Sequence, residues 1–187
     1  MSLVELLLVL GLMGVIAAMS VPALLTGLDE ARGIGAARYL ASRVRWARTQ
    51  AALRSAAVGI RFESGVAGWR FTVYSDGDRD GIGTSDVRRG IDPVLVPAER
   101  LDQRFPGVGI GIRAGTPRLD GGAALGADPV RLGRTDTLSV SPAGSSTSGT
   151  VFLHTRRGRQ FAVRVLGATG RARVWWLHPT TGRWAMR

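Results

Sequence analysis

Two arginines and a tryptophan near the C-terminus have the types and spacing to bind nucleic acid. The segment reads Gly170-Arg171-Ala172-Arg173, and Trp175 follows two residues later. A guanidinium pairs with phosphate oxygens, often through two hydrogen bonds, and an indole stacks on an exposed base. Alternate residues of a strand share a face, so we expect Arg171, Arg173 and Trp175 to face the same side. The alternative is a solvated strand edge whose arginines prevent pairing with another strand.

A second basic run, Arg156-Arg157-Gly158-Arg159, would strengthen the positive field of that surface if the two segments lie close together. The whole chain is basic, with a net charge of +11, and all 25 of its basic residues are arginine. A surface of this charge attracts phosphate backbones, anionic lipids or acidic partners. The sequence therefore makes DNA a candidate partner.

Three aspartates at alternate positions, Asp76, Asp78 and Asp80, precede Gly81 and resemble the front half of a calcium-binding loop. Such loops carry oxygen ligands at alternate positions and a glycine at the sixth. The acidic residue required at the twelfth position is missing here. The other interpretation is a hairpin turn whose aspartates accept hydrogen bonds from their own backbone, and it is the one we expect.

The residues that enzymes of the common classes require are missing from the sequence. There is no cysteine, and the two histidines are far apart. No Gly-x-x-x-x-Gly-Lys phosphate loop is present. The sequence therefore predicts a protein that is not an enzyme and, apart from calcium, no cofactor.

The N-terminal segment, residues 1–28, is mostly apolar, and its one charged side chain is that of Glu5. Residues 6–28 carry no charge and would form a helix about 34 Å long, enough to cross a bilayer core of about 30 Å. An ionised carboxylate next to such a segment costs on the order of a few kcal/mol unless it is paired. Glu5 therefore suggests a partner cation, such as the α-amino group of a neighbouring subunit. The alternative is a signal-anchor helix with Glu5 at the headgroup level.

The helix is expected to continue beyond residue 28. Apolar or small side chains recur in residues 29–56 at steps of three and four, which predicts an amphipathic helix continuous with the anchor, about 54 residues in all. Gly33 and Gly35 weaken its middle, and Gly11, Gly14 and Pro22 permit a kink.

After residue 57 the apolar period changes to two, which predicts strands. The sequence favours an α+β fold with three parts: the membrane or filament-core half of the helix (1–28), the half packed on the head (29–56), and a β-rich head (57–187) built on a mostly antiparallel sheet. Residues 113–136 are expected to form a long loop. The predicted strands are 58–62, 69–73, 94–96, 108–112, 138–140, 150–154, 160–166 and 171–177, the first two joined as a hairpin.

The sequence Met1-Ser2-Leu3-Val4-Glu5-Leu6 resembles the mature N-terminus of type IV pilins and type II secretion pseudopilins. That family opens with Phe, sometimes Met, and has Glu at the fifth position. Segments 141–144, 149–153 and 169–174, together with the Asp/Gly-rich turn after Trp69, resemble the GspH/FimT group of pseudopilins. The resemblance covers most of the chain but does not include residues 98–136.

The resemblance implies a minor pilin or pseudopilin subunit of a type IV pilus or type II secretion filament. It implies a precursor cut by prepilin peptidase, with Met1 as the processed and methylated residue; otherwise Met1 is a start codon. It also implies a single pass through the bacterial inner membrane with the head outside the cytoplasm, and then a filament of pilins or pseudopilins in the periplasm or at the cell surface. In FimT-like members the Gly-Arg-x-Arg segment is associated with DNA binding during uptake, which would make Gly170, Arg171 and Arg173 a DNA site. A membrane-anchored protein that never enters a filament is the third alternative.

Overall fold

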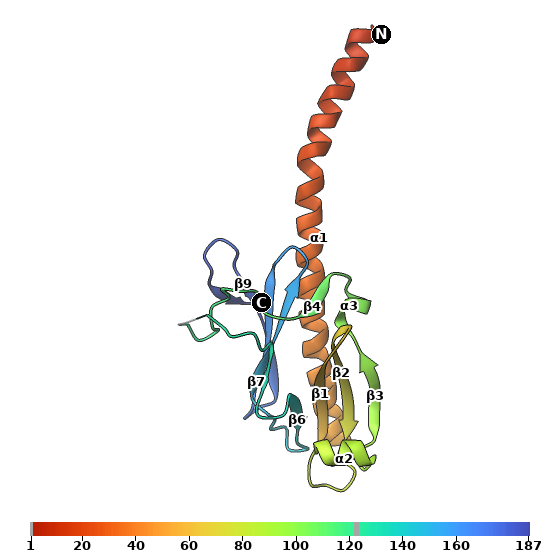
Figure 1. Cartoon of the computed structure of the whole chain (residues 1–187), viewed down its shortest axis with the longest axis vertical. Helices are drawn as coiled ribbons and strands as arrows, with labels where there is room; N and C mark the ends of the chain where they lie inside the picture. The colour runs from red at the N-terminus through yellow and green to blue at the C-terminus, as the bar shows by residue number, and fades with distance from the viewer. Residues whose placement is uncertain (1, 122–123) are drawn as a thin grey trace.

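The computed structural model describes residues 2–121 and 124–187. A single long helix, α1 (Leu3–Arg54), projects from a head made of antiparallel strands and two short helices (Figure 1). The long N-terminal apolar helix packed on antiparallel strands confirms the α+β class predicted from the sequence.

The helix α1 begins at a capping box and ends at a left-handed residue. Ser2 accepts a hydrogen bond from the Val4 amide at 3.2 Å, and Glu5 accepts one from the Ser2 amide at 3.4 Å. At the other end, Ser55 has φ 51° and closes the helix. The helix runs through Pro22 without a break, so the permitted kink does not interrupt it.

The first sheet has the strand order β3-β2-β1-β6. Its strands are β1 (Val58–Gly65), β2 (Gly68–Ser75), β3 (Val94–Glu99) and β6 (Thr137–Val140). The pairing of Val58 with Ser75 and of Gly65 with Gly68 confirms the predicted hairpin. Gly68 has φ +100°, a conformation that favours glycine, which explains why the turn is placed there.

The second sheet has the order β10-β9-β8-β7-β4, and β5 pairs with the edge of β7. Its strands are β4 (Val108–Ile110), β5 (Val130–Leu132), β7 (Gly149–Thr155), β8 (Gln160–Leu166), β9 (Arg171–Leu177) and β10 (Trp184–Met186). Over the residues that the structure describes, the head therefore contains two antiparallel sheets, where the sequence suggested one. Residues 113–136 are also not wholly a loop, since β5 lies within them.

Both sheets and the second half of α1 share one hydrophobic core. It includes Leu40 and Val44 from the helix, Ile60 from the first sheet, and Leu153 and Phe161 from the second. Small side chains line the buried face of the helix and let the strands approach it closely. At Gly33, an added Cβ would lie 2.2 Å from the ring of Phe161, so only glycine fits there. The glycine that looked like a weak point in the helix is a packing contact.

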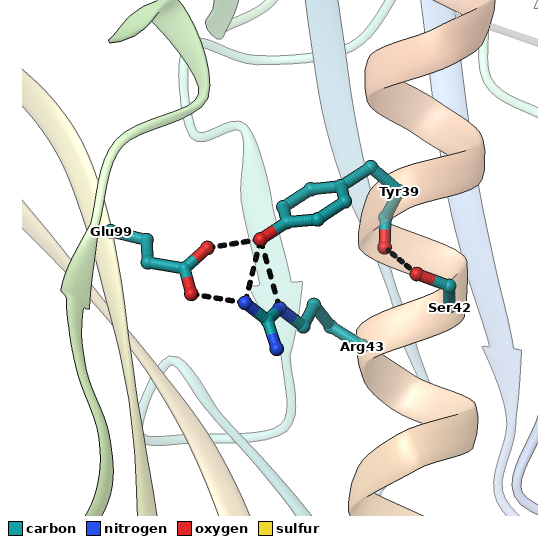
Figure 2. A network of polar contacts seen from close by, with 4 residues as sticks. All are labelled: Tyr39, Ser42, Arg43 and Glu99. Atoms are coloured by element: carbon teal, nitrogen blue, oxygen red, sulfur yellow. Dashed lines mark hydrogen bonds and ion pairs between the residues drawn. The ribbon is translucent and has the colours of Figure 1, made fainter. Parts of the chain in front are cut away.

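A polar network ties the helix to the edge of the first sheet (Figure 2). The Tyr39 hydroxyl donates a hydrogen bond to Glu99 of β3, and Arg43 forms an ion pair with the same carboxylate. Arg43 also donates to the Tyr39 oxygen, at 3.0 Å from Nε and 2.7 Å from Nη2. The guanidinium of Arg104, which follows β3 on the short helix α3 (Leu101–Arg104), lies 4.6 Å from the centre of the Tyr39 ring. The other short helix, α2 (Thr84–Arg89), connects β2 to β3.

Candidate functional site

The projecting half of α1 exposes apolar side chains from its tip to residue 28. Leu3 is 74% exposed, Leu12 60% and Leu24 66%, and the strongly apolar window of this helix has no residue buried by the head. By length and composition α1 can cross a membrane. Exposure changes between Leu28, which is exposed, and Asp29, which is buried.

Glu5 lies near the tip of this projecting half, one helical turn after Ser2, and its side chain is exposed. Within the chain its partner is the Ser2 amide, at 3.4 Å. Capping therefore gives Glu5 a local role that is distinct from pairing with a neighbouring subunit. Met1, predicted to be the processed and methylated residue, lies outside the described residues.

The Gly170–Trp175 segment forms the β8–β9 turn and the first part of β9. Arg171 and Arg173 are both exposed. Arg173 is opposite Arg164 of β8. Arg164 forms an ion pair with Asp120, and this hydrogen-bonded guanidinium holds the pKa of the Asp120 carboxyl below its usual range. No ion pair within residues 2–121 and 124–187 involves Arg171 or Arg173, so both charges face solvent.

A shallow pocket of about 240 Å³ lies next to this surface, because it is lined by Arg164, the cross-strand partner of Arg173. Arg118, Arg131 and Arg164 line it together with Asp120. With three guanidinium groups and one carboxylate, the lining of the pocket has a net positive charge. The pocket therefore extends the basic surface of Arg173 rather than interrupting it.

Gly170 and Trp175 have structural roles that the sequence did not indicate. Gly170 is buried with φ +60°, and a Cβ there would lie 2.7 Å from the Gly144 carbonyl oxygen. It is thus a turn residue rather than a contact surface. Trp175 is half-buried, and its Nε1–H is enclosed without a hydrogen-bond partner among the described residues. The indole therefore offers less stacking surface than the alternation of the strand predicted.

The sequence did not place Arg48 of α1 in this site. A Cβ at Gly170 would lie 3.6 Å from the Arg48 Cδ, and one at Gly144 would lie 3.3 Å from its Nε. Arg48 is exposed, so its guanidinium adds to the charges that follow Gly170. Arg48, Arg171 and Arg173 therefore lie at the same end of the head.

The structure does not bring the Arg156–Arg159 run to this site, so the condition under which its field would add to that of Arg171 and Arg173 is not met. The two turns flank β8 (Gln160–Leu166) and lie at its opposite ends. Arg157 lies beside Thr26 of α1, whereas Gly170 lies beside Arg48. That separation along the helix is about 33 Å at 1.5 Å per residue. It is about four Debye lengths at physiological salt, so the two groups act independently.

The three aspartates of the predicted calcium loop are close together, with ligand atoms within 4.8 Å of one another. Asp76 is buried and accepts hydrogen bonds from the Arg79 amide at 2.7 Å and the Gly81 amide at 3.0 Å. Its two oxygens thus close the turn, as the alternative interpretation requires. The hydrogen bond that protonated Asp80 donates to the Asp78 carboxylate, together with the nearby negative charges, raises the pKa of Asp80.

Comparison with protein-family models, with curated proteins and with solved structures gave no match to this chain.

Proposed function

We propose that this chain is a minor pilin or pseudopilin of the GspH/FimT kind, a subunit of a type IV pilus or type II secretion filament. In this proposal α1 first anchors the chain in the bacterial inner membrane, with the head outside the cytoplasm, and then joins the filament core. The observation that carries the proposal is the division of α1 into an exposed apolar half and a half buried in the head. Exposed side chains that are apolar on all sides of a helix require lipid or other apolar helices around them.

Glu5 supplies the assembly contact in this proposal. It is exposed near the tip of the projecting half, where it pairs with the N-terminal ammonium of a neighbouring pilin or pseudopilin. Such a pair offsets the cost of keeping a carboxylate among apolar helices. Processing of a precursor by prepilin peptidase and methylation of Met1 belong to the same proposal and rest on the resemblance of the first six residues.

The capping box makes a sharp experiment available. Glutamine at position 5 still accepts the hydrogen bond from the Ser2 amide but carries no charge. We expect Glu5→Gln to remain in the membrane and to be recovered in sheared filaments at a severalfold lower level than the natural chain. Ser2→Ala is the matched control, because it removes the other half of the capping box and keeps the charge of Glu5.

The opposite pattern would contradict the assembly role. If Glu5→Gln enters filaments normally and Ser2→Ala does not, Glu5 acts only as a helix cap. If the natural chain itself stays in the membrane fraction when the filaments of its host are sheared, it is a membrane-anchored protein and not a filament subunit.

A second candidate function is DNA binding during uptake, in addition to a place in the filament. It is supported by the exposure of Arg48, Arg171 and Arg173 at one end of the head, free of ion pairs among the described residues. Guanidinium contacts with phosphate are independent of sequence and weaken steeply with salt, because each contact releases a counterion. We expect weak binding without sequence preference, with a Kd at or above about 1 μM.

The DNA test compares two double variants of the full chain in detergent. Arg171→Gln/Arg173→Gln should lose most of its affinity and about two units of salt slope. Arg156→Gln/Arg157→Gln removes the same charge at the other end of β8 and should lose little. Equal losses would mean diffuse attraction by the +11 chain, and a larger loss in the second variant would move the nucleic-acid site to the other end.

A further inference from the structure

The end of the head from which α1 projects carries its own group of arginines. A pocket of about 220 Å³ lies here, bordered by Leu25 and Leu28 of the helix and by Arg32, Arg156 and Arg157. All three arginines are exposed. The β7–β8 turn that carries two of them lies alongside the helix just below its projecting part (Figure 1). Apolar helix side chains and guanidinium groups thus meet at one level.

A second pocket, of about 360 Å³, adjoins the first, since Arg157 lines both. It is bordered by Thr26, Arg113, Arg157 and Gly158. Arg113 donates a hydrogen bond from Nη1 to the Gly158 carbonyl oxygen at 2.5 Å, which fixes its guanidinium against the turn. We refer to Arg32, Arg113, Arg156 and Arg157 as the collar arginines.

The carboxylates at this end of the head are already engaged. Asp29 is buried and accepts a hydrogen bond from the Thr155 hydroxyl. Glu30 lies between Arg159, at 3.9 Å, and Arg187, at 3.3 Å. Within residues 2–121 and 124–187 no ion pair involves a collar arginine. Their charges are therefore directed outward.

The length of α1 determines the depth at which the collar arginines would lie in a bilayer. Residues 6–25 of α1 would be about 30 Å long, which matches the thickness of the hydrocarbon core. The helix residues that follow, up to Arg32, then lie in the headgroup layer on the side of the head. The pockets place Arg156 and Arg157 beside Leu25, Thr26 and Leu28, at that same level.

We propose that the collar arginines bind the phosphates of anionic phospholipids and hold the head against the membrane that α1 enters. Guanidinium groups pair with phosphate oxygens, and a basic residue close to an anionic membrane surface strengthens binding by about fivefold. The contact requires only that α1 crosses the membrane, so it does not depend on filament assembly. It also gives the Arg156–Arg157 turn a partner other than DNA.

The test measures which lipids surround the full chain in phosphatidylcholine vesicles. Trace amounts of spin-labelled phosphatidylglycerol or spin-labelled phosphatidylcholine report the relative association of each headgroup with the protein. The natural chain should prefer phosphatidylglycerol by about two- to fivefold at low salt, and the preference should decrease as salt screens the contact. Arg156→Gln/Arg157→Gln should remove most of this preference.

The control is Arg171→Gln/Arg173→Gln, which removes the same charge at the far end of β8 and should keep the lipid preference. Near-UV circular dichroism verifies the fold of each variant, and Arg32→Gln, on the helix rather than the turn, gives a second reduction. No preference in the natural chain would overturn the proposal. Equal losses in the two double variants would also overturn it, because they would show an effect of net charge alone.

Discussion

The two halves of α1 both carry small residues, but in opposite surroundings. In residues 29–54, small side chains face the sheets, and Ala37, Ala47 and Ala51 are completely buried. In residues 3–28, Gly11 and Gly14 have nothing within 4 Å of an added Cβ, and the leucines are exposed. A small residue on the buried face of the head half is a contact within the chain, whereas Gly11 and Gly14 of the projecting half have open space around them.

This comparison shows that apolar composition alone does not say what a helix packs against. The head half has an apolar face and a charged face, and only the apolar face is buried. The projecting half is apolar around its whole circumference, so it needs an apolar environment on every side. Substitutions in each half distinguish an apolar environment that the chain itself provides from one that external partners provide.

The largest expected difference between the halves is in core truncation. Leu40→Ala removes a side chain that is 1% exposed and should lower the free energy of unfolding of the head by about 2–5 kcal/mol. Leu10→Ala, at a position 56% exposed, should change it by less than about 0.5 kcal/mol. Urea denaturation of the full chain in detergent, followed by tryptophan fluorescence, measures both. Similar losses would mean that the projecting half also packs on the head.

Gly→Ala substitutions in α1 should have a smaller effect on stability, and the direction of the change distinguishes the two halves. On propensity alone, Gly→Ala in a helix stabilises it by about 1 kcal/mol. At Gly33 the new Cβ would meet the Phe161 ring at 2.2 Å, so we expect Gly33→Ala to destabilise the head by about 1–3 kcal/mol. Gly14→Ala has open space around it and should leave the head unchanged. Stabilisation by Gly33→Ala, seen as a higher urea midpoint, would show that the helix lies further from β8 than described.

The smallest expected effect concerns the Tyr39–Arg43–Glu99 network, which anchors only the head half. Tyr39→Phe removes a hydrogen bond to a half-buried carboxylate and should cost about 1.5 kcal/mol, the lower end of the range for a bond to a charged group. Burial, and then the hydrogen bond to Glu99, raise the pKa of Tyr39. Because the folded pKa is the higher one, this stabilisation is complete below pH 10 and decreases as the pH rises through the folded pKa.

Denaturation at pH 8 and above pH 10 tests the Tyr39 prediction. The natural chain should lose more stability between the two conditions than Tyr39→Phe does. Tyr74 is the other tyrosine of the chain, so Tyr74→Phe is the matched control. If the natural chain and Tyr39→Phe lose the same free energy of unfolding between the two pH values, ionisation of Tyr39 does not cause the alkaline decrease in stability.

Much of the fold follows from local patterns in the sequence. The long apolar run and the amphipathic stripe after it predict α1, and alternation predicts most strands, including the β1–β2 hairpin. The division into two sheets was missed because it depends on β6 pairing with β1, far away in sequence. Residues 113–136 were assigned to a loop because the three-residue strand β5 is too short to show a period.

The candidate sites were predictable to the extent that they lie within one element. The exposure of Arg171 and Arg173 follows from their position at the start of a strand. Arg48 was missed because its contact with Gly170 joins a helix to a distant turn. The distance of Arg156 and Arg157 from Gly170 could have been predicted from the sequence. A seven-residue strand separates their turn from Gly170, and the two turns that flank one strand lie at its opposite ends.

The measurement that tests the central claim most directly is cysteine accessibility in sheared filaments from the host of this protein. The chain has no cysteine, so single-cysteine variants carry one reactive thiol. Leu10→Cys tests the projecting half, and Val66→Cys, at the fully exposed tip of the β1–β2 hairpin, is the reference. If α1 forms the filament core, a membrane-impermeant maleimide will label Val66→Cys quickly and Leu10→Cys much more slowly. Equal labelling of the two variants would contradict the account.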